Sequence, residues 1–218
     1  MSKVDIKVYR DLMGENEKWA EQTRNLLDEK NVFMLNIIGS PGCGKTALLE
    51  NSVRRLEGRV RFAVLEGDVE TTRDAERLNA LGVPVSQLLT DGACHLEAKL
   101  VHHALRDLPL DEMNIVIVEN VGNLVCPAEF DIGEHAKIAV LSVTEGEDKP
   151  IKYPLLFRES RAVVLSKVDL LPHLAFDIEA CINYIRRING DIPVMKVAAV
   201  NGTGMDEWVD HLAKRNFE

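Results

Sequence analysis

The residues best suited to chemistry form a glycine-rich stretch that follows the first apolar run, Leu35–Ile38. The stretch fits the pattern GxxxxGK[ST] in the strand–loop–helix setting that this pattern requires. Its glycines allow backbone N–H groups to surround phosphate oxygens, its lysine can reach the outer phosphates and its threonine hydroxyl can ligate Mg²⁺. We therefore expect this loop and the helix after it to bind a nucleoside triphosphate through Gly39, Pro41, Gly42, Cys43, Gly44, Lys45, Thr46 and Ala47.

Two acidic residues, Asp68 and Glu119, stand at the ends of predicted strands. In phosphate-loop enzymes a carboxylate at a strand end holds Mg²⁺ directly or through water, although such carboxylates also serve as helix caps. Asp74, in the first turn of a predicted helix, could orient water or could simply be solvated. The predicted catalytic residues are Lys45, Asp68, Asp74 and Glu119, and the predicted magnesium ligands are Thr46, Asp68 and Glu119.

The stretch Ser166-Lys167-Val168-Asp169 follows another predicted strand and resembles the base-reading motif NKxD of GTPases. The Asp169 carboxylate can accept two hydrogen bonds from guanine, and adenine lacks the matching donors. The Lys167 stem can lie across the purine plane. Ser166 stands where the motif usually has Asn, so the role of that amide is open. The stretch predicts that the nucleotide is GTP or GDP.

Three possible metal ligands, Cys94, His95 and Cys126, fall in two predicted loops at one edge of the sheet. Two thiolates and an imidazole suit Zn²⁺ or Ni²⁺, and the alternative is that the cysteines are structural thiols. Three donors leave a tetrahedral ion one ligand short. Neighbouring residues at a helix start point in different directions, so we expect Cys94 and His95 to bridge two ions more easily than to chelate one. Both features favour a site shared across a two-fold dimer axis.

Several nearby residues leave alternatives open. Lys99 and His103 follow His95 on a predicted helix and could join the metal site, although surface or core-edge positions are commoner. Cys43 is either a small residue tolerated in a tight loop or a redox-sensitive thiol whose pKa is lowered at a helix N-terminus. Cys181 lies in an apolar helical stretch and is expected in the core.

The loop at residues 119–127 joins the two predicted sites. Its first residue is a predicted magnesium ligand and Cys126 is a predicted ligand of the second metal. A segment that the γ-phosphate orders and hydrolysis releases is a known kind of switch. We therefore hypothesise that the GTP state changes metal affinity or dimerisation through this loop.

Composition limits the classes of protein that fit the 218-residue chain. A hydrophobic fraction of 46% is enough for a sizeable core, and four cysteines are too few for a disulfide framework. The net charge of −9 argues against a general nucleic-acid or anionic-membrane surface. No stretch has the length and apolarity of a membrane span, and the N-terminus lacks the apolar region of a signal peptide. We expect a cytoplasmic protein that binds neither nucleic acid nor membrane.

The elements that must position these residues alternate between buried strands and helices. We expect a surface helix over residues 15–30 after a loose opening dozen residues, and a polar loop over 144–154. Continuous apolar strands separated by helices indicate a doubly wound α/β fold, with a mainly parallel sheet covered on both faces. Ligands of such sheets bind at the carboxyl ends of the strands, where all the loops above fall. We predict one GTPase domain over residues 1–218, with 1–30 as a helical extension packed on it. The predicted strands are 35–38, 60–65, 83–89, 114–118, 137–143, 162–165 and 194–197. The helices after the first are 47–56, one into which the polar stretch 70–78 passes and which Gly82 closes, 96–108, 176–188 and 205–214.

Together these motifs resemble the hydrogenase nickel-incorporation GTPases HypB, of the SIMIBI class of phosphate-loop proteins. The resemblance spans nearly the whole chain and is specific, because few other proteins combine adjacent Cys-His with ENVGNLVCP. Urease accessory GTPases of the UreG type would be expected to show Cys-Pro-His instead. The matching stretches are Leu35–Glu50, Gly67-Asp68, Asp91–Leu96, Glu119–Pro127, Thr144–Pro154 and Ser166–Leu170.

The resemblance implies a metallochaperone that uses slow GTP hydrolysis to help load nickel into [NiFe] hydrogenase. It implies a GTP-dependent homodimer, the partner HypA and the hydrogenase large subunit as client. Cys94, His95 and Cys126 match the interfacial metal ligands of the family, and Lys152 matches a position that reaches the nucleotide from the dimer partner. The chain lacks the N-terminal Cys-rich and His-rich metal motifs of some members, so no separate storage site is expected.

Three other functions remain alternatives at this point. The first is a urease-type nickel accessory GTPase. A metal-binding module with a regulatory nucleotide site would transfer metal even when hydrolysis is blocked. A phosphate-loop kinase would need a second-substrate pocket, for which the sequence gives no sign.

Overall fold

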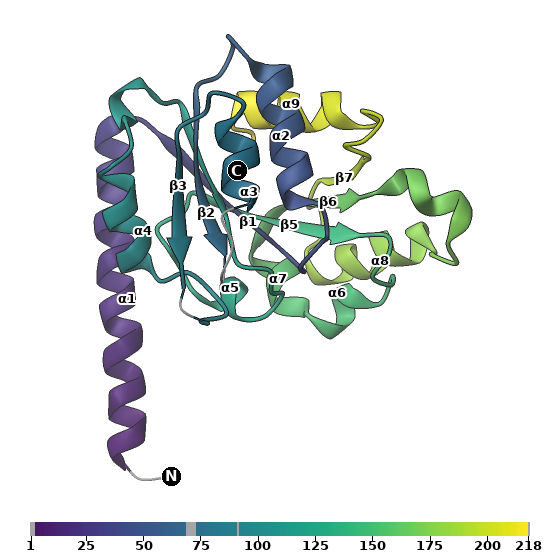
Figure 1. Cartoon of the computed structure of the whole chain (residues 1–218). Coiled ribbons are helices and arrows are strands. Elements are labelled where there is room, and N and C mark those ends of the chain that lie inside the picture. Colours follow the sequence, from purple (N-terminus) through teal and green to yellow (C-terminus); the bar gives the residue numbers. More distant parts are fainter. Residues whose placement is uncertain (1–2, 69–72, 91, 218) are drawn as a thin grey trace.

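The computed structural model describes the backbone of residues 3–68, 73–90 and 92–217, and the side chains of 14–67, 74–90 and 92–217. The described chain forms one seven-stranded sheet in the order β3-β2-β4-β1-β5-β6-β7 (Figure 1). The strands are β1 (Phe33–Gly39), β2 (Phe62–Asp68), β3 (Val85–Leu89), β4 (Ile115–Glu119), β5 (Ala136–Ser142), β6 (Ser160–Ser166) and β7 (Val194–Val197). Every pairing between neighbouring strands is parallel, which confirms the predicted fold class.

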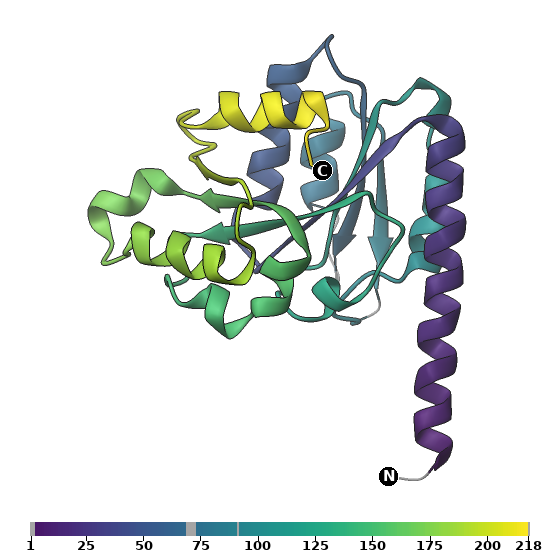
Figure 2. The same ribbon diagram turned by 180° about the vertical axis from the view of Figure 1, so that it is seen from behind.

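Helices connect successive strands and cover both faces of the sheet (Figures 1 and 2). They are α1 (Lys3–Lys30), α2 (Lys45–Leu56), α3 (Arg73–Asn79), α4 (Ala98–Leu105), α5 (Cys126–Glu129), α6 (Lys149–Lys152), α7 (Pro154–Glu159), α8 (Ile178–Ile188) and α9 (Met205–Lys214), with short 3₁₀ helices at Leu110–Glu112 and Val168–His173. None of the described helices is both long and apolar enough to cross a membrane.

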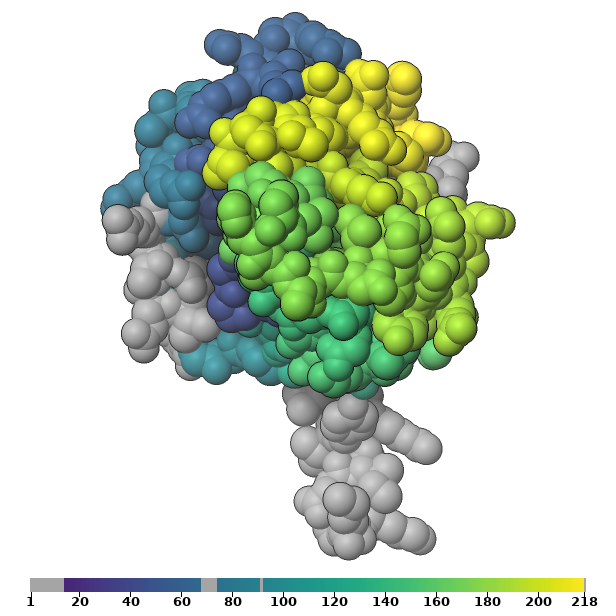
Figure 3. Space-filling view, turned by 90° about the vertical axis from the view of Figure 1, so that its right-hand side faces the viewer, coloured from purple at the N-terminus to yellow at the C-terminus, as the bar shows by residue number. Residues whose placement is uncertain are grey.

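The apolar core has one continuous cluster on one face of the sheet and two clusters on the other. On the first face α2, α3 and α9 pack on the sheet, with Trp208 of α9 fully buried. On the second face α1 and α4 cover the half formed by β2, β3 and β4, while α7 and α8 cover β5 and β6. In the space-filling view the green and yellow segments, which follow β5 in the chain, form most of the visible face (Figure 3). Burial on both faces explains why the strands read as continuous apolar runs.

Helix α1 packs on the domain through its second half. Ala20 and Leu27 are buried, the Thr23 hydroxyl lies 3.2 Å from His102 Nδ1, and Trp19 contacts the rings of His102 and His103. The helix begins at Lys3 rather than after a loose dozen residues, and residues 3–13 contain no proline or glycine that would end it. That part of the prediction was wrong.

The stretch at 144–154, predicted to be a polar loop, contains α6 and is followed by α7. Both are shorter than two turns and begin with proline at an early position, so they lack the long apolar repeat that identifies a helix in a sequence. Leu156 and Phe157 of α7 are buried against β5 and β6. Tertiary packing, rather than a local pattern, therefore fixes these helices.

Candidate functional site

The glycine-rich loop joins the carboxyl end of β1 to the start of α2. Gly44 caps α2 with φ at +99°, a left-handed conformation that glycine adopts without strain. A Cβ at Gly39 would lie 2.4 Å from the Val140 carbonyl oxygen of β5, so only glycine fits there. The Lys45 side chain is buried and its ammonium donates to the Gly39 and Ser40 carbonyls at 3.4 Å. These long bonds hold the lysine over the loop, where it can turn to a phosphate.

The predicted magnesium ligands Thr46 and Glu119 meet at the carboxyl ends of β1 and β4. The Thr46 hydroxyl donates to Glu119 Oε1 at 2.9 Å, and Glu119 Oε2 is buried with no hydrogen-bond partner in the described structure. Burial raises the pKa of Glu119 from 4.5 to about 7, although Lys45 and Thr46 favour the charged form. A hydroxyl beside an orphaned carboxylate oxygen fits a hard divalent cation such as Mg²⁺. The side chain of Asp68, the last residue of β2, lies outside the described part.

Asp74 is held by an ion pair at the first turn of α3. Arg77 donates to the Asp74 carboxylate at 2.8 Å and to both carboxylate oxygens of Glu50 at 2.9 and 3.0 Å. The negative charge of Asp74 is one of the smaller causes that raise the pKa of Glu119. Asp74 therefore lies within electrostatic reach of the Thr46–Glu119 pair, and its role in orienting water stays a prediction.

A cavity of about 260 Å³ lies beside the glycine-rich loop at the predicted base-reading motif. Asp169 lines it, and the Oδ1 atom of Asp169 is buried without a partner in the described structure. Such an acceptor is suited to the paired donors of guanine. The cavity is lined by Gly44, Ala47, Leu48, Ser166, Lys167, Asp169, Leu170, Val197, Ala199 and Val200.

Lys167 and Ser166 both tie β6 to the glycine-rich loop. Lys167 has φ at +59° and donates to the Gly42 carbonyl at 2.6 Å, while the Ser166 hydroxyl donates to the Cys43 carbonyl at 2.6 Å. At the position where the motif usually has asparagine, a serine can therefore hold the phosphate-binding loop through a hydrogen bond.

Ala199 and Val200 form part of the wall of this cavity, and the sequence did not lead us to predict them as site residues. They follow β7, the last strand of the sheet, and Val200 is 82% exposed. The available signal was topological, because a loop after a parallel strand lies at the ligand-binding edge even when it carries no motif.

The cysteines outside the metal cluster are inert by burial. Burial raises the pKa of the Cys43 thiol to about 11 and that of the Cys181 thiol to about 12. Cys43 therefore behaves as a small core residue, and the alternative of a lowered pKa at a helix N-terminus was wrong. Cys181 lies in the core cluster on α8, as its apolar setting predicts.

The predicted metal ligands Cys94, His95 and Cys126 do come together. Their donor atoms all lie within 4.8 Å of one another, with 2.8 Å between the two sulfur atoms and 3.7 Å between Cys94 Sγ and His95 Nδ1. One ion can therefore contact all three donors of one chain, so the expectation that Cys94 and His95 point apart was wrong. The reason is that α4 begins only at Ala98, so Cys94 and His95 lie in a bend rather than a helical turn.

Without a metal, the surroundings of the cluster favour the neutral, metal-binding form of His95 and the protonated form of Cys94. The His95 ring stacks on Phe130 at 3.9 Å between centroids, and burial lowers the pKa of His95, which keeps the imidazole neutral. A hydrogen bond shared with Cys126 raises the pKa of the Cys94 thiol, and a bound cation would displace that proton. His95 Nε2 is buried without a partner in the described structure.

The neighbouring residues that could have joined the metal cluster point elsewhere. The Lys99 ammonium lies 5.8 Å from the Trp19 ring centroid, and His103 packs 5.2 Å from the same ring. Both therefore face α1. Lys152 of α6 is exposed and pairs with Asp148 on its own segment, so its predicted reach toward a partner subunit stays a prediction.

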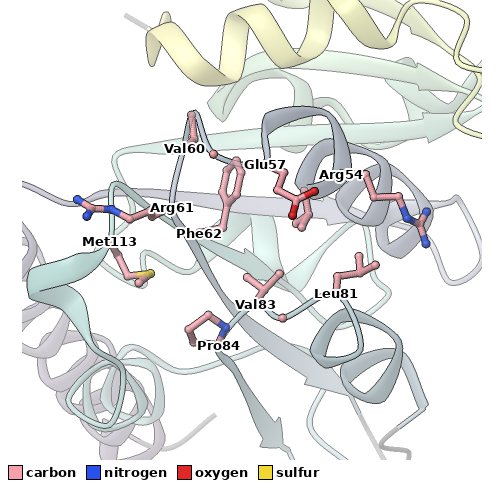
Figure 4. A pocket seen from close by; sticks show the side chains of 12 residues that line it. Arg54, Glu57, Val60, Arg61, Phe62, Leu81, Val83, Pro84 and Met113 are labelled. Atoms are coloured by element: carbon pink, nitrogen blue, oxygen red, sulfur yellow. The ribbon is translucent and has the colours of Figure 1, made fainter.

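A second cavity of about 300 Å³ lies at the opposite, amino edge of the sheet, before β2 and β3 (Figure 4). Phe62 and Val83 form its apolar wall, and the guanidinium groups of Arg54 and Arg61 point away from each other at its two sides. None of the predicted site residues lines it.

Comparison with known proteins identifies the family of the chain. A family model described as the CobW/HypB/UreG nucleotide-binding domain matches residues 33–196. The hydrogenase maturation factor HypB of Azotobacter vinelandii is 50% identical over 204 residues, which are 94% of this chain and 67% of that protein. The protein of the same name from Escherichia coli K12 is 47% identical, over 95% of this chain and 71% of that protein.

Solved structures extend the likeness to the whole fold. HypB from Helicobacter pylori in complex with nickel superposes with a TM-score of 0.89 at 33% identity, covering 94% of this chain and 97% of that one. HypB from Archaeoglobus fulgidus superposes with a TM-score of 0.87 at 33% identity, covering 94% and 100%. The chain belongs to the CobW/HypB/UreG family of nucleotide-binding proteins and, within it, to the hydrogenase maturation factors HypB.

Proposed function

We propose that this protein is a GTP-hydrolysing metallochaperone that binds nickel or zinc at a GTP-dependent dimer interface and assists nickel insertion into [NiFe] hydrogenase. The observation that carries the proposal is the loop after β4. Its first residue, Glu119, is hydrogen-bonded to Thr46 of the nucleotide site. Cys126, near the end of the loop, has its Sγ atom 2.8 Å from that of Cys94 in the metal cluster. One short segment thus belongs to both sites.

The chain's own residues can perform GTP hydrolysis by positioning and charge. Lys45 neutralises negative charge on the outer phosphates, and Asp169 selects guanine. Thr46 and Glu119, with Asp68 as the predicted third, would hold Mg²⁺, which supplies charge neutralisation at the phosphates. Asp74 is the candidate for orienting the attacking water. Glu119, whose pKa is raised to about 7, is assigned to Mg²⁺ and not to the attacking water, which suits slow, switch-like hydrolysis.

Delivery of metal is the second half of the proposal. Two thiolates and an imidazole suit both Ni²⁺ and Zn²⁺, and a tetrahedral ion needs one more ligand than they supply. Val125, beside Cys126, is 52% exposed, and Ile151, beside Lys152, is 53% exposed. An exposed apolar side chain next to an incomplete metal site, and another beside Lys152, support a second copy of the chain as the missing partner. Lys152 would then reach the partner's nucleotide, and HypA and the hydrogenase large subunit would exchange metal with the dimer.

The test is a Ni²⁺ titration followed by light-scattering mass, first with GDP and then with a non-hydrolysable GTP analogue. The proposal expects a dimer that holds nickel with the analogue and weaker binding by a monomer with GDP. Cys126→Ala should lose metal and keep nucleotide. Equal metal binding by a monomer in both states would refute the gating, and it would favour a metal-binding module with a regulatory nucleotide site.

A further inference from the structure

The loop between Glu119 and Cys126 contacts the phosphate-binding loop directly at Gly122. A Cβ added to Gly122 would lie 2.8 Å from Cγ and 2.9 Å from both Cα and N of Pro41. The φ of Gly122 is not in the left-handed region, so its backbone would accept other residues. Glycine is therefore needed at this position for close approach to Pro41 and for no other visible reason.

Residues 120–125 of this loop, called segment 120–125 below, are hydrogen-bonded to the loop that carries the other two metal ligands. The Asn123 side chain donates to the Cys94 carbonyl at 3.2 Å, and its oxygen accepts from the Val125 backbone at 2.9 Å. The Asn120 side-chain oxygen accepts from the Leu96 N–H at 3.4 Å. Hydrogen bonds from segment 120–125 therefore reach the backbone of the residues on both sides of His95.

Asn120 is anchored in turn to the interior of the sheet. Its amide donates to Asn36 of β1 at 3.0 Å, and the Asn36 amide donates to Glu134 at 3.1 Å. All three side chains are buried, on a sheet face whose neighbouring residues are apolar. Satisfied buried polar networks of this kind hold one arrangement of the backbone, because any other arrangement leaves polar groups unpaired.

Leu96 adds an apolar contact between the metal-bearing loop and the end of β2. A Cβ at Gly67 would lie 2.8 Å from Leu96 Cδ1, so the leucine packs directly on the backbone beside Asp68. The loop that holds Cys94 and His95 is thus fixed both to segment 120–125 and to a strand that ends at the predicted magnesium site.

We propose that Gly122 is the contact through which the phosphate-binding loop sets the position of segment 120–125, and that Asn123 and Asn120 pass this position to Cys94 and His95. The inference rests on the proposed nucleotide control of metal binding and names the residues that carry it. Gly122, Asn120 and Asn123 are positioning residues, since none of them is among the predicted ligands of either metal.

The experiment compares Ni²⁺ affinity with GDP and with a non-hydrolysable GTP analogue in the full chain and in Gly122→Ala. The added methyl group cannot fit against the Pro41 backbone, so segment 120–125 must move away from the phosphate-binding loop. The matched control is Gly190→Ala, because nothing lies within 4 Å of a Cβ at Gly190 and its φ is not left-handed. Guanine-nucleotide affinity and the number of metal ions bound are measured in parallel.

Nucleotide coupling between two binding sites usually changes affinity about 5- to 150-fold, and we expect the native chain and Gly190→Ala to fall in this range. In Gly122→Ala the two nucleotide states should differ by less than about twofold while the chain still binds both metal and nucleotide. If Gly122→Ala keeps the full difference in Ni²⁺ affinity between the two nucleotide states, the inference is overturned and the proposed function still stands. No difference in the native chain would overturn both.

Asn123→Ala tests the link from the opposite side, and it keeps the inference falsifiable if Gly122→Ala does not fold. This half-exposed side chain can be truncated without leaving a buried polar group unpaired. The variant should bind GTP as the native chain does and show a smaller difference in nickel affinity between the two nucleotide states. An unchanged difference would show that Asn123 does not transmit the position of the segment.

Discussion

The burial of the Glu119 carboxyl group leads to a prediction about the stability of the folded chain. This prediction can be tested without nucleotide or nickel. The pKa of Glu119 rises from 4.5 to about 7 in the folded chain, chiefly because burial penalises the charged form. Between these values the folded state holds a proton that the unfolded state has released. Stability therefore falls as the pH rises through this window, in the opposite sense to a salt-bridged carboxylate.

The magnitude follows from the size of the change in pKa. One pKa unit corresponds to ~1.36 kcal/mol, so deprotonation of Glu119 should cost the folded state about 3 kcal/mol by pH 8. Glu119→Gln resembles the protonated form, because the amide oxygen can still accept from the Thr46 hydroxyl. The variant should match the native chain near pH 4.5 and exceed it by about 3 kcal/mol at pH 8.

The assay is reversible urea unfolding at several pH values between 4.5 and 8, without nucleotide or divalent cation. The quantity of interest is the difference in the free energy of unfolding between Glu119→Gln and the native chain, because the contributions of the other titrating groups cancel in this difference. Glu112→Gln, on the exposed surface, serves as the matched control. A difference that stays constant across the whole pH range would refute the reasoning, and Mg²⁺ with GDP should reduce the difference by favouring the charged carboxylate.

Three further substitutions test other parts of the site. Asp169→Asn should weaken GTP binding about tenfold to a hundredfold in a calorimetric titration, because a hydrogen bond to a charged acceptor is lost; unchanged affinity would remove Asp169 from base recognition. Phe130→Ala removes the ring stacked on His95, so Ni²⁺ affinity should fall about two- to tenfold while GTP affinity holds; an equal loss of GTP affinity would instead indicate a general structural defect. Gly39→Ala places a Cβ 2.4 Å from the Val140 carbonyl, so the chain should lose about 1–3 kcal/mol in urea unfolding, and an unchanged midpoint would contradict the close approach.

Local patterns in the sequence were enough for the sheet and for most of the site. The apolar runs predicted every strand of the described sheet, because strands buried on both faces must be apolar throughout. β7 and α9 were predicted at their observed bounds, Val194–Val197 and Met205–Lys214. Helices α6 and α7 were missed, because short helices held by tertiary packing carry no long periodic signal.

The types of ligand were evident in the sequence, whereas their geometry was not. Cysteine and histidine at positions 94, 95 and 126 already favoured Zn²⁺ or Ni²⁺, and the glycine-rich loop with Lys45 and Thr46 indicated a nucleotide. Only the folded chain places Cys94 and His95 in a bend, so that their donor atoms converge instead of splaying apart as adjacent helical residues would.

What the sequence alone determined is the chemistry of each site, because donor atoms and glycine spacing are properties of residue type and order. What the tertiary structure decided is how the sites are joined. Gly122 meets Pro41, and Asn120 meets Asn36 and Leu96, across separations in the chain that no local pattern records. The pKa of Glu119 is likewise a product of folding, because it depends on removing the carboxyl group from water and on the charges that the fold brings near it.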